Sequence, residues 1–174
     1  MAYTKSELVE LVRQTARQYG IDEGVALAQI QAESSWNPNA VSESGAQGLF
    51  QFMPQTWATW GSGSPFDPYA AAPAWANYFT YILNLYGWNY GYALAAYNWG
   101  ENRNTLQQGY AAGKDVLSLN LPSETRGYVQ KILGSAGNVQ PQFADYNAPQ
   151  VGGLFWPIAI GIGALVFLFL TGDD

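Results

Sequence analysis

Glu33 stands at a position of its predicted helix that would ordinarily hold an apolar residue. Ala26, Ile30 and Glu33 follow the i, i+4, i+7 spacing of one helix face, so the carboxyl group should point in the same direction as the apolar side chains. Burial disfavours the charged form of a carboxylic acid, so an acid in this setting can stay protonated near neutral pH and serve as a general acid. The alternative is an ordinary Glu at a fraying helix end, turned to solvent.

The residue types present restrict the chemistry further. The chain of 174 residues contains no Cys and no His, which excludes Ser-His-Asp and Cys-His nucleophilic sites, zinc sites built on these ligands, and disulfides. Catalysis must therefore rest on carboxylates, amides, hydroxyls or tyrosines, and we expect neither a metal nor another cofactor. The net charge of −6 argues against a nucleic-acid partner. Aromatic residues make up 16% of the chain. They suit a neutral polymer that stacks on flat rings, although an ordinary aromatic core with a membrane segment explains them more simply.

The elements that would position Glu33 are helices. Thr4 and Glu7 can form a capping box for an amphipathic first helix, and Gly20 ends that helix. Asp22 follows directly and can cap the helix that carries Glu33.

The remainder of the amino-terminal region is also predominantly helical. Helices are predicted over residues 67–87, 88–98 and 122–134. The first of these has an apolar stripe that includes Trp75, Phe79 and Ile82, and the last places Tyr128 on an apolar stripe. Gly45 and Gly48 lie in the stretch SESGAQGLFQFMP, which predicts a small turn or hairpin beside the Glu33 helix. We therefore expect a mostly α fold with a minor β element.

The carboxyl-terminal part of the sequence differs in character. Residues 135–150 lack periodicity and indicate a polar linker, whereas residues 151–172 contain no charge and are long enough to cross a bilayer. The alternative for the second segment is a buried helix of a soluble protein. The first thirty residues contain no cationic start followed by an apolar run, so we expect no signal peptide.

Four sequence blocks occur in order over residues 30–133: AESSWNPNAVS, GAQGLFQFMPQTW, ALAAYNWG and LPSETRGYVQKIL. Each is weak alone, but together they resemble the lysozyme-like lytic transglycosylases, glycoside hydrolase family 23, which are related to goose-type lysozyme. The resemblance implies a lysozyme-like α+β catalytic domain over residues 1–134 with a minor β-hairpin. A linker over residues 135–150 and a transmembrane helix over residues 151–172 would complete the chain.

The resemblance also implies roles for individual residues. Glu33 takes the place of the sole catalytic carboxylate, and Tyr97 would form a hydrogen bond near it. A structural explanation exists for several of the others: Met53 can be core, Ser42 can cap a turn, and Glu124 can be an ordinary first-turn acid. The implied substrate-binding residues are Ser42, Gln51, Met53, Tyr97, Asn98 and Glu124.

No second acid of the kind that a two-carboxylate glycosidase needs stands out in the sequence. Glu43, Asp67, Glu101 and Glu124 all occupy settings typical of solvated loops or helix starts. Lytic transglycosylases need no such residue. The resemblance implies cleavage of the MurNAc-GlcNAc β-1,4 bond, assisted by the N-acetyl group, and formation of 1,6-anhydro-MurNAc. A goose-type hydrolase and a non-catalytic glycan-binding or structural membrane protein remain alternatives.

The sequence also bears on how such an enzyme would reach the cell wall. A bacterial enzyme that acts on its own wall must be exported, but an apolar segment at the end of the chain would act too late as an export signal. We therefore expect a virion-associated enzyme, used for local wall penetration during phage infection. Its partners would be peptidoglycan, a lipid membrane and other virion proteins. Post-translational insertion into a bacterial inner membrane is the alternative.

Overall fold

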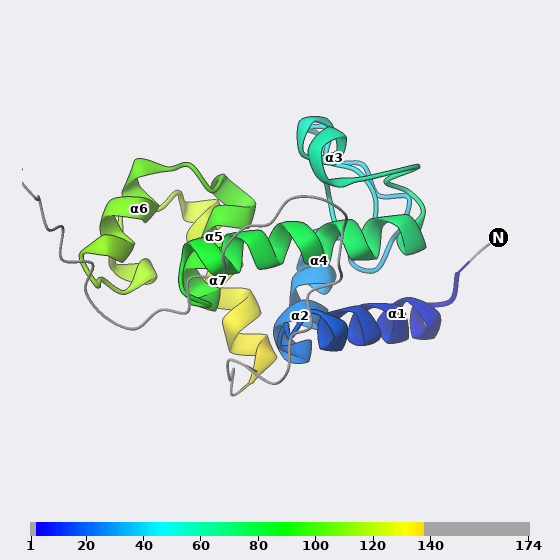
Figure 1. Cartoon of the computed structure of the whole chain (residues 1–174), viewed down its shortest axis with the longest axis horizontal. Coiled ribbons are helices and arrows are strands. Elements are labelled where there is room, and N and C mark those ends of the chain that lie inside the picture. Colours follow the sequence, from blue (N-terminus) through cyan, green and yellow to red (C-terminus); the bar gives the residue numbers. More distant parts are fainter. Residues whose placement is uncertain (1–2, 138–174) are drawn as a thin grey trace, which may run out of the picture.

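The computed structural model describes residues 3–137, and its regular secondary structure consists of helices joined by loops (Figure 1). The elements, in chain order, are α1 (Lys5–Gln18), α2 (Glu23–Ser34), α3 (Pro54–Trp60), α4 (Pro68–Leu85), α5 (Tyr90–Trp99), α6 (Asn104–Ala111), the 3₁₀ helix η1 (Val116–Ser118) and α7 (Ser123–Ala136).

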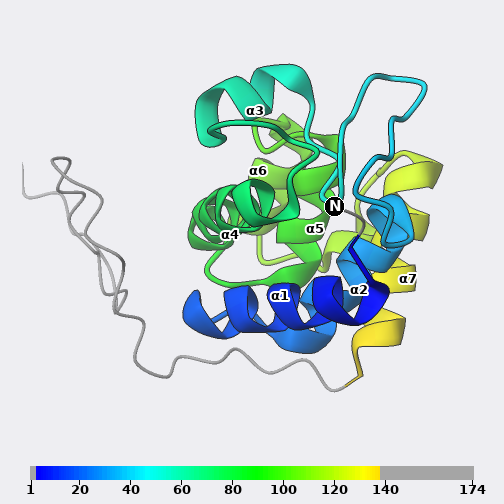
Figure 2. The same ribbon diagram turned by 90° about the vertical axis from the view of Figure 1, so that its right-hand side faces the viewer.

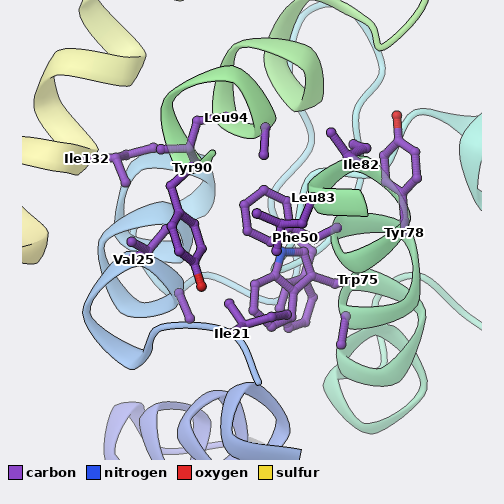
Figure 3. Packing of buried hydrophobic residues seen from close by; sticks show 14 of the residues in the cluster. Ile21, Val25, Phe50, Trp75, Tyr78, Ile82, Leu83, Tyr90, Leu94 and Ile132 are labelled. Carbon is purple, nitrogen blue, oxygen red and sulfur yellow. The ribbon is translucent and has the colours of Figure 1, made fainter. Parts of the chain in front are cut away.

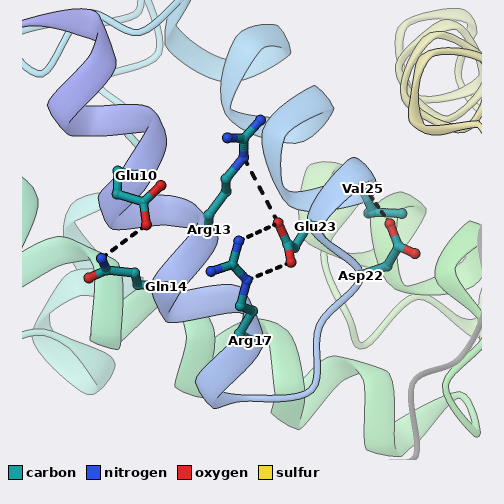
Figure 4. Close-up of polar contacts among 7 residues, drawn as sticks. All are labelled: Glu10, Arg13, Gln14, Arg17, Asp22, Glu23 and Val25. Carbon is teal, nitrogen blue, oxygen red and sulfur yellow. Dashed lines mark hydrogen bonds and ion pairs between the residues drawn. The ribbon is translucent and has the colours of Figure 1, made fainter.

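The first two helices begin where the sequence predicts. Thr4 and Glu7 form the reciprocal capping box of α1, and the Asp22 carboxylate accepts a hydrogen bond of 2.9 Å from the backbone N–H of Val25 at the start of α2 (Figure 4). Arg17 and Glu23 join the two helices through an ion pair of 2.7 Å that is also drawn there. Because both side chains are largely exposed, solvent screens this pair, and the caps do more to define where the helices start.

The hydrophobic core forms around α4, which packs against α1, α3 and α5. Trp75 is fully buried and stacks between Phe50, at 5.3 Å between ring centroids, and Phe79, at 5.9 Å. Figure 3 shows Phe50 and Trp75 close to Ile21, which lies in the connection between α1 and α2. The apolar stripe predicted on this helix is therefore the stripe that is buried.

α2 lies between α1 and α7, and α7 in turn packs against α5 (Figure 2). This arrangement brings the carboxyl-terminal turn of α2 next to a helix that lies about a hundred residues later in the sequence. It is the packing that assembles the candidate site.

The predicted hairpin is reduced to two isolated bridges, and residues 3–137 contain no β-strand. Gln47 pairs with both Val41 and Phe52. Gly45 and Gly48 lie in the turns between the paired residues and adopt φ values of +89° and +76°, which glycine adopts without a steric cost. The mostly α prediction is therefore confirmed, and the predicted hairpin is present in the described residues only as these two bridges.

Two short helices and the end of α7 differ from the elements that the sequence predicts. The sequence patterns predict neither α3 nor α6, and α7 continues to Ala136, into the predicted linker. The rest of that linker and the apolar segment 151–172 lie outside the described residues. Within residues 3–137, none of the helices has both the length and the apolar character needed to cross a bilayer.

Candidate active site

Glu33 lies in the last turn of α2, on the side of the helix that faces the core. Ala26 and Ile30, on the same face, are fully buried, and Glu33 keeps intermediate exposure. Directly after the helix, Ser35 and Trp36 both adopt left-handed φ values, 52° and 69°. This conformation is costly for residues other than glycine, and burial of the Trp36 side chain helps to hold it. The turn ends the helix immediately beyond the carboxylate.

Tyr128 is the direct partner of this carboxyl group. Its hydroxyl, on α7, donates a hydrogen bond of 2.5 Å to Oε1 of Glu33. Nothing in the local pattern marks Tyr128, because it lies on the same apolar stripe as Val129 and Ile132. The only signal available was its presence in the fourth sequence block.

The surroundings shift the pKa values of both groups upward. Burial raises the pKa of Glu33 to about 7, and the Tyr128 hydrogen bond lowers it against that trend. Burial, and then the charge of Glu33, raise the pKa of the Tyr128 phenol well above its ordinary value. At neutral pH Glu33 is therefore divided between its protonated and charged forms, and Tyr128 remains a neutral donor.

Tyr97 lies close to Glu33 but does not donate its hydrogen bond to it. Burial, with the charge of Glu33 as the second cause, raises the pKa of the Tyr97 phenol well above its ordinary value. The Tyr97 hydroxyl instead donates a hydrogen bond of 2.7 Å to the backbone carbonyl of Phe50. The expected hydrogen bond near the Glu33 carboxyl is thus made by Tyr128, and Tyr97 attaches α5 to the loop before α3.

Three further predicted residues make internal hydrogen bonds. The Gln51 amide nitrogen donates to the carbonyls of Gly48, at 2.8 Å, and Ala40, at 3.3 Å. Ser42 Oγ accepts from the backbone N–H of Ala46 at 2.9 Å. Asn98 Oδ1 accepts from the Thr125 hydroxyl at 2.8 Å and connects α5 to α7. These contacts hold the loop and the helices around Glu33.

The two remaining predicted residues are exposed. Met53, which precedes α3, is 43% exposed and is therefore not a core residue. Glu124 is exposed in the first turn of α7, where its negative charge interacts favourably with the helix dipole. No hydrogen bond joins Glu124 to the other site residues within the described part of the chain.

The described residues around Glu33 include neither a cluster of metal ligands nor the surface cavity described below. Among residues 3–137, no group of three or more His, Cys, Asp or Glu side chains is placed to hold a metal ion. A surface cavity of about 250 Å³ lies elsewhere, lined by Leu85, Tyr86, Glu101, Gln107 and Tyr110. The titratable groups that the structure brings together here are Glu33, Tyr128 and Tyr97.

Comparison with known proteins places this arrangement in a family. Residues 10–118 match the family model described as Transglycosylase SLT domain. The chain belongs to this family. The match includes the first three sequence blocks and confirms the resemblance that all four suggest.

Relatives of this SLT domain are found in bacteria and in a phage. The soluble lytic murein transglycosylase of Salmonella typhimurium is 34% identical over 139 residues, which are 71% of this chain and 21% of that protein. The transglycosylase of Enterobacteria phage PRD1 is 30% identical over 155 residues, which are 83% of this chain and 58% of that protein.

A solved structure shows the same fold. The 70 kDa soluble lytic transglycosylase of Escherichia coli superposes with a TM-score of 0.63 at 32% identity, over 73% of this chain and 23% of that one. This SLT domain thus spans about a fifth of the length of the bacterial relatives it matches.

Proposed function

We propose that this SLT domain is a peptidoglycan lytic transglycosylase in which Glu33 is the single catalytic acid and base. The observation that carries the proposal is the Glu33 carboxyl itself: it is held by Tyr128 at 2.5 Å, and its pKa is raised to about 7 by burial. A group with this pKa can donate a proton and later accept one at the same pH.

The reaction would proceed in two steps on the MurNAc-GlcNAc β-1,4 bond. In the first, Glu33 gives its proton to the glycosidic oxygen, the bond from C1 of MurNAc to that oxygen breaks, and the N-acetyl carbonyl oxygen bonds to C1. In the second, the Glu33 carboxylate takes the proton of the MurNAc 6-hydroxyl, whose oxygen displaces the N-acetyl oxygen from C1. The product is a 1,6-anhydro sugar, and no water is consumed.

The surroundings of Glu33 favour this route over one that uses a protein nucleophile. Within residues 3–137, the pKa of Glu33 is shifted by burial and by Tyr128, without a contribution from another carboxylate. Two acids close enough to share one sugar would perturb each other's titration. Substrate assistance by the N-acetyl group removes the need for the second acid.

The remaining site residues have supporting roles in this proposal. Exposed Met53 would contact the sugar, and Glu124 would lie at the margin of the bound strand. Ser42, Gln51, Tyr97 and Asn98 would shape the substrate-binding surface through the hydrogen bonds described above.

We further propose that residues 1–134 form the catalytic domain, residues 135–150 a linker, and residues 151–172 a single-pass membrane anchor. The support is the uncharged run of 22 residues at 151–172, which is about the length that a bilayer requires. The similarity to the phage PRD1 transglycosylase supports association with a virion, where the enzyme would open the wall locally during infection.

Mass spectrometry of digested peptidoglycan tests the activity. Wild-type protein should release muropeptides that end in 1,6-anhydro-MurNAc, each lighter by one water than its hydrolytic counterpart, and Glu33→Gln should release none. Reducing-end products as the dominant species would instead assign a lysozyme-type hydrolysis. Absence of any release by the wild type would refute the enzymatic proposal.

Zymography of purified virions tests the delivery proposal. Virions should carry lytic activity, and a variant truncated after Pro149 should lose membrane association. Activity found only in uninfected host membranes would reject the virion assignment. A truncated protein that still binds the membrane would reject the anchor.

A further inference from the structure

We infer that Gln29 is a positioning residue that orients the Tyr128 hydroxyl toward Glu33, and that Trp75 fixes the orientation of the Gln29 amide. This inference rests on the proposed role of Glu33 and deepens it. It assigns a function to a polar side chain in the core that the proposed reaction does not otherwise use.

The position of Gln29 is the first observation. It lies four residues before Glu33 on α2, which places both side chains on the same helix face. Its exposed fraction is 0%, although an amide is costly to bury without partners. The same helix packs directly against α7, which carries Tyr128.

Trp75 determines which way the amide faces. An indole N–H can only donate, and Trp75 Nε1 donates to Gln29 Oε1 at 3.2 Å. Its ring is held between Phe50 and Phe79, so the indole cannot swing away. The amide oxygen must therefore face Trp75, and the Nε2 group must face the opposite way.

The Nε2 group of Gln29 is the end of the amide that Trp75 does not bind, and it lacks a hydrogen-bond partner among the described residues. This nitrogen is buried. The Gln29 side chain lowers the pKa of the Tyr128 phenol, against the upward effect of burial. Only a donor can stabilise a phenolate, so the interaction must come from the N–H groups and not from the amide oxygen.

A donor on this side dictates the direction of the Tyr128 hydroxyl. With an N–H directed at its oxygen, the phenol places its single proton on the line to Glu33 Oε1. A phenol that donates stabilises the carboxylate form of Glu33, whereas one that accepts would stabilise the protonated form. Gln29 thus favours the orientation that opposes the effect of burial on Glu33.

Few other titratable groups act on this cluster. From α2 the group that faces Tyr128 is Glu33, and from α5 it is Tyr97, whose phenol remains neutral. No Lys or Arg among residues 3–137 contributes to the pKa of Glu33 or Tyr128. A change in Glu33 titration on substitution of Gln29 would therefore arise through Tyr128.

The variant Gln29→Met tests the inference, because Met has a similar length and helix propensity but lacks the amide. Two readouts are taken: the pH dependence of wall lysis, and the titration of the Glu33 carboxyl by ¹³C NMR, assigned by comparison with Glu33→Gln. The pH profile of lysis and the Glu33 titration should both shift to higher pH by roughly half to one unit. This is smaller than the shift expected if Glu33 lost the charge-assisted hydrogen bond entirely. A lowered unfolding temperature with an unchanged pH profile would overturn the inference.

A double-variant cycle separates positioning from packing. Tyr128→Phe alone should shift the Glu33 titration further than Gln29→Met, and adding Gln29→Met to Tyr128→Phe should shift it no more. A Gln29 effect that persists without the Tyr128 hydroxyl would also overturn the inference.

Thr80→Val serves as the matched control. It removes another buried polar atom that lacks a hydrogen bond, and it should leave the Glu33 titration in place. A shift of the same size in this control would mean that the titration responds to any core substitution, which would refute the role of Gln29. The NMR titration reads Glu33 directly, so it tests this inference even if the wild-type protein were to lack transglycosylase activity.

Discussion

The Tyr128 hydroxyl donates to Oε1 of Glu33 across 95 residues of sequence. This contact joins the end of α2 to the middle of α7, and the site depends on it in two ways. It fixes the carboxyl group in space, and it keeps the Glu33 pKa from rising as far as burial alone would take it.

Replacement of Glu33 by Gln should abolish wall lysis while the fold is retained. The amide has nearly the same shape but cannot transfer the proton, and loss of a general acid lowers rates by about 10² to 10⁴. Lysis rates and circular dichroism of the two proteins check this. Retention of more than about a tenth of the activity would exclude Glu33 as the acid.

Glu33 should also make the stability of the wild type depend on pH. Its folded-state pKa of about 7 lies above the ordinary value of 4.5, so its contribution to stability is fully present below the ordinary pKa and is lost as pH rises through the folded one. Between these values the loss should approach, at most, about 1.4 kcal/mol per pH unit.

Chemical denaturation of wild type and Glu33→Gln at pH 5, 6, 7 and 8 measures this dependence. The wild type should lose stability relative to the variant as pH rises, because the variant has no charge to bury. Parallel curves would show that the carboxyl group is not desolvated in solution.

Tyr97→Phe should reduce both stability and turnover. The change removes the hydroxyl that donates to the backbone carbonyl of Phe50, a buried residue. An unpaired buried acceptor costs roughly 1 to 3 kcal/mol. Thermal unfolding and steady-state lysis check the two effects. Full stability with impaired turnover would instead indicate direct contact of the hydroxyl with substrate.

Gly48→Ala should destabilise the loop far more than Gly45→Ala. Both glycines have positive φ, which costs about 1 to 2 kcal/mol for other residues, but only Gly48 is crowded: an added Cβ would lie 1.9 Å from the Pro65 carbonyl oxygen, whereas the one at Gly45 meets nothing within 4 Å. Unfolding free energies of the two variants provide the comparison. Equal losses would show that backbone conformation alone matters here.

Local signals in the sequence determined the framework of the site. Capping by Thr4 and Asp22 set the starts of α1 and α2, and the apolar stripe around Trp75 set α4, because caps and periodicity act within a few residues. The same periodicity placed Glu33 on the inner face of α2. α3 and α6 escaped prediction because they have only 7 and 8 residues, too few for a clear period.

Tertiary structure alone decided which polar groups meet. Tyr97 was expected to bind near Glu33 and Tyr128 was not, yet Tyr128 binds Glu33 and Tyr97 binds a loop carbonyl. The Gln51 amide nitrogen likewise donates to a carbonyl within its own loop, that of Gly48. A hydrogen bond depends on separations of a few tenths of an ångström between elements, and those are fixed only when α2, α5 and α7 have packed. Sequence periodicity defines the face on which a side chain lies, and packing defines its partner.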